Sequence, residues 1–421
     1  MATTTTQGMT NEAAFEVIGA YLSRHKADAF RALGIDAVQD RREGVRIWDL
    51  EGNSFINCRS SGGVFNFGHH PRFAVDALKA ALDEHDMGDW LLPSLRRAQG
   101  AEALARILPG DLHYTFFTPS GAEAVEVACK LARGVTGKAE IVSAEHGYHG
   151  HVGFSLAMDE DEYSRWFRPL VPGVLKVPFG DLAAIERAVG KDTAAVCLET
   201  IQATAGIIMP PDDYLERVRN ICDQHGALLI LDEVISGFRL GYGGAQAAYG
   251  VHADLTTLGK IIGGGLPVGA YGGRRDIMQM VAPLGPVYQA GTLAGSPLAM
   301  RAGIATVRQL QNAGFYETLE RKTARLAEGF RAALAECGVP GQVSAAGSLL
   351  TLFFSAEPVT DYAAAKKSDT QRFARFFGEM LRRGIFLPPS QFEALFVSAA
   401  HTDEDIERTI AACRESLPAI H

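Results

Sequence analysis

The chain has 421 residues, of which 47% are hydrophobic and 21% charged, and its formal net charge at pH 7 is -9. This length exceeds what one hydrophobic core usually organises, and the composition is globular, so we expect a large domain with a smaller second one. The acidic balance, 49 Asp plus Glu against 40 Lys plus Arg, argues against a nucleic-acid or anionic-membrane partner.

The N-terminus and the cysteines bear on where the protein works. The first residues lack a basic segment followed by an apolar one, and no run approaches roughly 18 uninterrupted apolar positions. The six cysteines are scattered without a Cys-x-x-Cys pair, so they suit neither a zinc knuckle nor a thioredoxin-like motif. We therefore expect a cytoplasmic protein with reduced, mostly buried thiols and no membrane partner.

The predicted elements begin after a Thr-rich stretch of six residues, which we expect to be frayed. Residues 12–33 have a helical pattern, and strand patterns at 45–48 and 54–57 flank a Gly-containing turn, which predicts a hairpin. Helical patterns then alternate with short apolar runs. The helices include 122–133 and 214–225, and the strands are 114–117, 141–143, 195–198, 227–231 and 255–258.

This alternation predicts an α/β fold with a mostly parallel central sheet that is covered on both faces. After a helix at 297–311 the pattern changes to a second, α+β domain. Its predicted elements are helices at 315–337, 370–383 and 402–416 and a strand at 349–354. We expect an N-terminal segment at 1–59 that joins the small domain, a large domain at 60–305, and a C-terminal small domain at 306–421.

Two residues at the expected ends of strands carry the strongest chemical signal. Asp232 follows an apolar strand, where Asp also commonly caps a loop. Lys260 lies between apolar residues and a run of glycines, and an isolated Lys there could also extend to the surface. Together they match a pyridoxal-phosphate site, which requires a Schiff-base Lys of lowered pKa and an Asp facing the protonated pyridine nitrogen.

A phosphate site is expected where Ser120-Gly121-Ala122 follows a strand and opens a helix. The free backbone N–H groups and the dipole of a helix N-terminus bind anions, although Ser120 taken alone is an ordinary N-cap. Glycine-rich segments mark further places where the backbone approaches something closely. They are 60–63, 241–244, 263–265 and 269–273.

Tyr148 follows another expected strand and suits stacking on a flat ring. Its neighbours His146, His149 and His151 also suggest a metal site. Their spacing matches no zinc-helix motif, and no nearby set of Cys or carboxylate residues completes four ligands, so we expect no metal.

Several longer segments carry a family resemblance. They run Leu231-Asp-Glu-Val-Ile-Ser-Gly-Phe-Arg239, Gly243-Gly-Ala-Gln-Ala-Ala-Tyr-Gly-Val251, and Asp254-Leu-Thr-Thr-Leu-Gly-Lys-Ile-Ile-Gly-Gly-Gly-Leu-Pro-Val-Gly-Ala270. In these segments, and in 288–300, 388–394 and 400–405, the chain resembles class III pyridoxal-phosphate aminotransferases, most of all the glutamate-1-semialdehyde aminomutase group. The resemblance covers residue 45 to the end, and it is most specific between Asp232 and Lys260.

The resemblance implies a fold-type I homodimer with shared active sites, in which pyridoxal phosphate cycles with pyridoxamine phosphate. Lys260 would form the Schiff base, Asp232 would bind the pyridine nitrogen, and Thr292 would reach the phosphate of the neighbouring subunit. The catalytic residues are thus Lys260 and Asp232. The cofactor-binding residues are Ser120, Gly121, Ala122, Tyr148, His149, Glu199, Asp232, Val234, Lys260 and Thr292.

Departures from the family pattern bear on the reaction. Ala122 replaces a Thr of the phosphate loop, so one hydroxyl contact is lost while the backbone contact survives. Gln202 stands where aminomutases tend to carry a small residue, and Ser61 lies in a stretch that lacks their Trp, which predicts a wider pocket. The segment after His151 also differs from their gating loop.

These departures favour transfer of an amino group between a donor amine or amino acid and an aldehyde or ketone. A 2,1-aminomutase or an epimerase is the alternative. Trp90 could instead pack at the dimer interface, and Arg239, a further candidate, could pair with a carboxylate. The expected substrate contacts are Arg31, Ser61, Trp90, Gln202 and Glu393.

Overall fold

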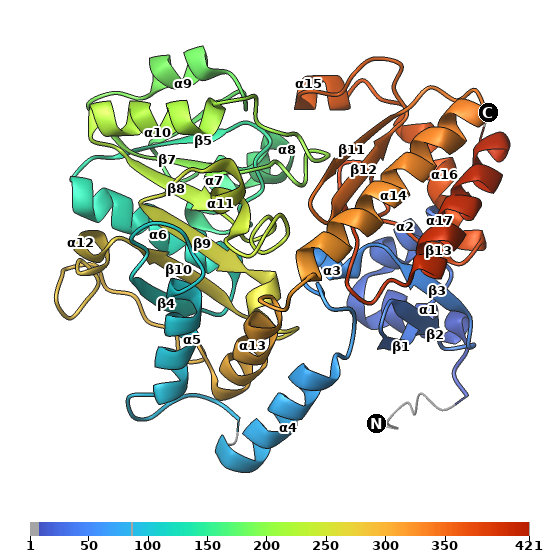
Figure 1. Cartoon of the computed structure of the whole chain (residues 1–421), viewed down its shortest axis with the longest axis horizontal. Helices are drawn as coiled ribbons and strands as arrows, with labels where there is room; N and C mark the ends of the chain where they lie inside the picture. Colours follow the sequence, from blue (N-terminus) through green and yellow to red (C-terminus); the bar gives the residue numbers. More distant parts are fainter. Residues whose placement is uncertain (1–7, 86, 421) are drawn as a thin grey trace.

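The protein is described by a computed structural model over residues 8–85 and 87–420. It has two lobes, a large one around a seven-stranded sheet and a smaller one that contains elements from both ends of the chain (Figure 1). The frayed tail expected at the first six residues lies outside the described residues.

The central sheet has the strand order β4-β10-β9-β8-β7-β5-β6. Every neighbouring pair from β6 to β9 is parallel, and β10 is antiparallel to both β9 and β4. The predicted α/β fold with a mostly parallel sheet is therefore confirmed. The strands are β4 Tyr114–Thr118, β5 Glu140–Ala144, β6 Val174–Val177, β7 Thr193–Glu199, β8 Leu228–Asp232, β9 Leu255–Gly259 and β10 Gly269–Gly273.

The strands are continuous apolar runs because helices cover both faces of the sheet. In β8, Ile230 packs in a core with α6 (Gly121–Thr136), whereas Leu229 packs in a second core with α10 (Tyr214–His225). The side chains of successive residues in one strand thus point to opposite faces of the sheet, as the pleat requires. The described helices of this lobe also include α5 Leu95–Ala105, α7 Gly153–Met158, α8 Asp161–Ser164, α9 Leu182–Ala188, α11 Gly244–Tyr249 and α12 Arg275–Met278.

The strand β10 was not expected, because its sequence Gly-Ala-Tyr-Gly-Gly contains few strand-forming residues. Its first residue, Gly269, lies so close to the loop before α6 that a Cβ there would be 2.1 Å from the Ser120 carbonyl oxygen. The expectation that this glycine cluster permits close backbone approach is confirmed at Gly269.

The smaller lobe joins the two ends of the chain in one sheet. Strand β13 pairs in parallel with β3 from the N-terminal hairpin, and a single hydrophobic core contains Ile56 together with Phe376 and Phe377. The small α+β part built from both chain ends is thus observed. Its strands are β1 Gln39–Glu43, β2 Arg46–Asp49, β3 Ser54–Asn57, β11 Gln342–Ala346, β12 Leu349–Phe353, β13 Ile385–Phe386 and β14 Leu395–Phe396.

The long C-terminal helices α14, α16 and α17 lie close to their predicted ranges, whereas the short α15 was not expected. The predicted N-terminal helix is interrupted by a π-helical turn at Gly19–Ser23. Among the described residues, no helix combines the length and apolar character that a membrane crossing demands. The helices are α1 Asn11–Ile18, α2 Arg24–Ala32, α14 Phe315–Glu336, α15 Tyr362–Ala365, α16 Thr370–Arg382 and α17 Asp403–Ser416.

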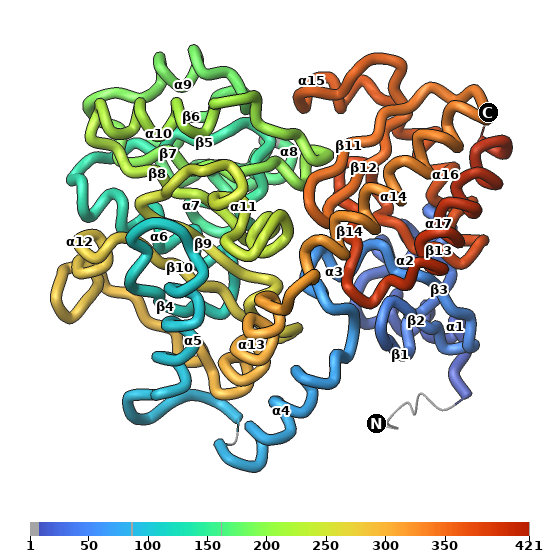
Figure 2. The backbone as a smooth tube through the Cα atoms, viewed as in Figure 1, coloured from blue at the N-terminus to red at the C-terminus, as the bar shows by residue number. Residues whose placement is uncertain are grey.

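Three further helices connect the lobes. The short α3 (Ser60–Gly63) follows β3, and the long α4 (Arg72–His85) extends along the lower edge of the molecule (Figure 2). Helix α13 (Pro297–Gln309) packs against α4 on the return path to the smaller lobe. The predicted domain boundaries at 59 and 305 fall in these connections and stay predictions.

Candidate active site

The carboxyl ends of three neighbouring strands bring the main polar groups together. Glu199 ends β7 and pairs in register with Asp232, which ends β8 and pairs in turn with Thr257 of β9. Lys260 follows β9 directly. Because parallel strands end at the same edge of the sheet, side chains far apart in sequence meet there.

The Asp232 carboxylate is held from three directions. Its Oδ1 accepts hydrogen bonds from the backbone N–H of Val234 at 2.9 Å and from the Thr257 hydroxyl at 3.1 Å. Its Oδ2 lies 2.7 Å from Nδ1 of His149. Burial alone would lower the pKa of His149, but the hydrogen bond and the charge of Asp232 outweigh it and raise that pKa. Asp232 is thus an oriented carboxylate that favours a positively charged nitrogen.

Lys260 occupies an unusual backbone conformation in a buried setting. Its φ is +49°, a left-handed value that non-glycine residues adopt at a cost and that concentrates at functional sites. Burial lowers the pKa of its amine, against the opposing charges of Asp232 and Glu199. A lowered pKa raises the fraction of neutral amine, which is the nucleophilic form.

Glu199 organises the segment that carries Tyr148. Its Oε1 accepts the Tyr148 backbone N–H at 2.9 Å and its Oε2 accepts the Ala203 N–H at 3.3 Å. Burial raises the pKa of this carboxyl to about 7, although His149 and the two N–H groups oppose the shift. Glu199 therefore fixes the backbone at Tyr148 and titrates near neutral pH.

The start of α6 forms an anion cradle beside these groups. The Ser120 hydroxyl accepts the Glu123 N–H at 3.2 Å as an N-cap, so the first backbone N–H groups of the helix are unpaired within it. A Cβ at Gly121 would lie 2.9 Å from the Val234 methyl groups, so only a glycine lets Val234 pack this close to the cradle. Such an N-terminus suits a phosphate.

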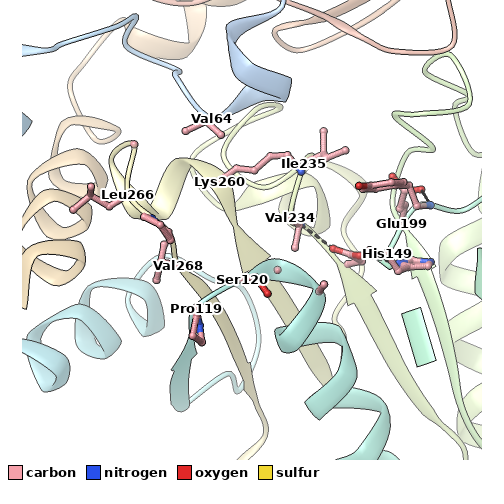
Figure 3. Close-up of a pocket in the computed structure, with 17 residues that line it drawn as sticks. Val64, Pro119, Ser120, His149, Glu199, Val234, Ile235, Lys260, Leu266 and Val268 are labelled. Atoms are coloured by element: carbon pink, nitrogen blue, oxygen red, sulfur yellow. Dashed lines mark hydrogen bonds and ion pairs between the residues drawn. The ribbon is translucent and has the colours of Figure 1, made fainter. Parts of the chain in front are cut away.

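A cavity of about 390 Å³ joins the cradle to the strand ends (Figure 3). Lys260 and Val234 border it near the middle of the view, and Glu199 and His149 lie to one side. The amine, the oriented carboxylate, the aromatic ring of Tyr148 and the anion cradle are the set that pyridoxal phosphate requires. The residues present therefore fit this cofactor.

A second cavity of about 440 Å³, here called the outer chamber, adjoins the first and shares Tyr148, Ile235 and Lys260 with it. An ion pair between Arg59 Nε and Glu393 Oε2, 3.1 Å apart, lies on its wall. The other lining residues are Gly62, His146, Gly147, Asp159, Glu160, Glu162, Tyr163, Ala203, Thr204, Tyr362, Ser390, Phe392, Ala394 and Phe396.

Most of the expected cofactor residues line the first cavity. These are Ser120, Gly121, Ala122, Tyr148, His149, Glu199, Asp232, Val234 and Lys260. Thr292 lies on an exposed loop outside both cavities of this chain. Of the expected substrate contacts, Glu393 lines the outer chamber.

Two expected substrate contacts form hydrogen bonds with neighbouring protein groups instead. The Gln202 amide donates to the Glu145 backbone carbonyl at 2.7 Å, so its side chain supports the loop before Tyr148. The Ser61 hydroxyl accepts from Arg42 at 3.1 Å. Neither residue lines the first cavity or the outer chamber, since these partners hold both side chains elsewhere.

Three other candidate contacts line neither cavity. Arg31 is paired with Glu12 at 2.7 Å on the N-terminal helices, and the Trp90 indole N–H donates to the Gly295 carbonyl at 2.7 Å. Arg239 is fully buried and donates to Ser348 Oγ and to two backbone carbonyls. The idea that Arg239 pairs with a carboxylate is therefore wrong, because neutral acceptors surround it.

The three histidines around Tyr148 contact three different carboxylates. His146 contacts Glu160, His149 contacts Asp232, and His151 Nδ1 lies 2.9 Å from Asp159 Oδ2. Across the described ranges, no three His, Cys, Asp or Glu side chains are grouped as a metal site would need.

Sequence reasoning missed most of the outer chamber. Arg59 stands directly before a glycine cluster that the sequence did single out, so its position carried a signal. Tyr163, Tyr362 and Phe392 come from separate segments that only the fold brings together. No local pattern marks them.

Comparisons with known proteins agree with the cofactor site that the geometry indicates. The model of the family "Aminotransferase class-III" matches residues 31–412. A glutamate-1-semialdehyde 2,1-aminomutase from Brevibacillus brevis is 44% identical over 92% of this chain and 93% of its own length. An ω-transaminase structure from Sphaerobacter thermophilus has a TM-score of 0.84 and 28% identity, over 95% of this chain and 98% of that one.

A further solved structure, a transaminase with pyridoxal phosphate bound, has a TM-score of 0.85 and 25% identity, with 98% of this chain and 99% of that one covered. Its fold and the family match agree with the cavity built at the ends of β7, β8 and β9. The chain therefore belongs to the class-III aminotransferase family of pyridoxal-phosphate-dependent enzymes.

Proposed function

We propose that this enzyme moves an amino group from a donor amine or amino acid to a separate aldehyde or ketone acceptor. The observation that carries the proposal is the position of Lys260, whose side chain borders both the cofactor cavity and the outer chamber. A substrate in the chamber and a cofactor in the cradle would therefore meet at this amine.

Each polar residue has a definite part in this scheme. Pyridoxal phosphate, when bound, supplies the electron sink for the substrate's carbon–nitrogen chemistry. Asp232 holds the proton on the ring nitrogen, supported by Thr257 and His149. Lys260 acts as nucleophile and moves the proton at its Nζ, and the N–H groups at the start of α6 hold the phosphate.

The walls of the outer chamber support transfer between two substrates. Gly62 presents no side chain where it lines the chamber, which leaves room for exchange of a product and a second substrate. Elsewhere in its lining, Glu162 and Tyr163 belong to the short helix α8, and Lys176 Nζ donates to the carbonyl of the nearby Asp159 at 2.7 Å.

The test is a half-reaction with the purified holoenzyme and a panel of amines and amino acids. We expect the pyridoxal-phosphate absorbance to be lost, with pyridoxamine phosphate and a free carbonyl product detected by mass spectrometry. Lys260→Ala should abolish turnover. Product formation at an unchanged rate in that variant would contradict the role of the amine.

A 2,1-aminomutase is the second candidate, and the 44% identity to a protein of that name favours it. The two functions differ in the fate of nitrogen. With a ¹⁵N-labelled substrate and an added acceptor, transfer places the label in the acceptor, whereas an aminomutase or epimerase returns it in an isomer of the substrate. Label confined to that isomer would refute the transfer proposal.

We further propose that two copies associate and that Thr292 of each contacts the phosphate in the other. The exposure of Thr292 in the single chain supports this. A cytoplasmic location is proposed as well, because all six cysteines are free thiols and five of them are buried.

A further inference from the structure

The outer chamber contains one guanidinium group, that of Arg59, among its lining residues. Its partner Glu393 lines the same space, 3.1 Å away, and the two side chains are 39% and 36% exposed. Both groups are thus accessible from the chamber. An ion pair in this partly hydrated setting is weak and can exchange partners.

The backbone that presents Arg59 is strained and firmly held. Ser60 and Ser61 have φ values of +47° and +54°, and Gly62 and Gly63 continue the left-handed run. Asn57 Oδ1 accepts the N–H groups of Arg59 and Ser60 at 3.0 and 3.1 Å, and buried Arg239 donates to the Gly63 carbonyl. Non-glycine residues in this conformation cluster at ligand sites.

Besides Glu393, three carboxylates line the chamber, those of Asp159, Glu160 and Glu162. Asp159 is paired with His151 and Glu160 contacts His146. The Tyr362 ring contacts the rings of His146 and Phe392, with centroid distances of 3.6 and 5.8 Å. The chamber therefore offers aromatic sides and one exchangeable cation.

We propose that Arg59 binds a carboxylate at the end of the substrate remote from the transferred amino group, and that this carboxylate replaces Glu393. The inference rests on the proposed function of the same site. A guanidinium binds a carboxylate through parallel hydrogen bonds, so the preferred substrates are amino acids with a distal acid group or the matching oxo acids. Glu393 neutralises Arg59 while the chamber holds no acid.

The test compares substrates that differ only at the remote end. A graded series of straight-chain ω-amino acids is assayed in the half-reaction beside the corresponding carboxamides and diamines. In Arg59→Gln, we expect kcat/KM for the best acid to fall about tenfold or more, while the value for its carboxamide stays within about twofold. In Glu393→Gln, KM for the acid should fall, because Arg59 is released.

Arg325→Gln is the matched control, since it removes one member of an exposed ion pair with Glu407 at 2.7 Å in the smaller lobe. Arg59→Lys should recover part of the preference for acids. Equal losses for acid and carboxamide in Arg59→Gln, or a wild-type preference for diamines, would overturn the inference. Failure of every amine to react would instead refute the proposed function.

Discussion

At the scale of single residues, Glu199 makes the stability of the fold depend on pH. Its carboxyl is 4% exposed and its pKa is raised to about 7, mainly by burial. In the unfolded chain a Glu titrates at about 4.3, so between that value and about 7 the folded state binds more protons than the unfolded one. The contribution of Glu199 to stability is therefore complete below that range and is lost as the pH rises through it.

We predict that Glu199→Gln removes this dependence in the cofactor-free protein. At about pH 5 the variant resembles protonated Glu199, so its Tm should be close to that of the wild type. At about pH 8 the ionised, buried Glu199 carboxylate destabilises the folded wild type by up to ~3 kcal/mol, so the variant should have the higher Tm. Calorimetry at both values measures the difference; a Tm difference that does not change with pH would contradict the prediction.

The sequence could predict those site residues whose chemistry is visible locally. Asp232 and Lys260 stand at the ends of apolar strands, and the fold places them together as expected. Arg31 and Gln202 carried the right functional groups but lie elsewhere, because Glu12 and the Glu145 carbonyl bind them. Which partner a polar side chain finds depends on the whole fold.

At the scale of elements, the cradle depends on contact between α6 and the segment after β8. Gly121→Ala would place a Cβ 2.9 Å from Val234, which packs beside the cofactor cavity. Overpacking of this kind costs about 1–3 kcal/mol, so we expect pyridoxal phosphate to bind about tenfold more weakly. Absorbance titration of the cofactor-free protein measures the affinity.

Gly190→Ala is the control, because a Cβ at Gly190 meets nothing within 4 Å and the residue lies outside both cavities. Its cofactor affinity should equal that of the wild type. Equal affinity in Gly121→Ala as well would show that the cradle tolerates the extra methyl group.

Helices and strands could be predicted where their packing imposes a clear hydrophobic pattern on the sequence. Buried parallel strands such as β7 and β8 are continuous apolar runs, and their limits were close to those expected. The edge strand β1 (Gln39–Glu43) was missed because all of its residues are exposed and polar. The glycine-rich β10 was missed because its position between two strands, rather than its propensity, makes it a strand.

At the scale of the whole molecule, exposed apolar residues gather on two loops at one edge of the large lobe. Leu91 and Leu92 are 92% and 79% exposed, and Leu293 is 57% exposed. The Trp90 indole joins the two loops through the Gly295 carbonyl. A patch of this kind is typical of a surface that another protein covers, and it includes the loop with Thr292.

We predict that the wild type elutes with the mass of two 45.2 kDa chains and that Leu91→Glu combined with Leu92→Glu yields single chains. Charges buried in an interface without partners oppose association. The variant should also bind pyridoxal phosphate more weakly, because it loses the contact from Thr292 of the partner. Light scattering coupled to gel filtration gives the masses.

Leu175→Glu provides the comparison, since Leu175 is 39% exposed on β6, at the opposite edge of the sheet from β4. It should remain a dimer with normal cofactor affinity. A dimeric double variant would place the interface elsewhere, and a monomeric wild type that binds the cofactor normally would show that one chain completes the phosphate site alone. The cofactor affinity therefore separates an interface that only joins two chains from one that shares their active sites.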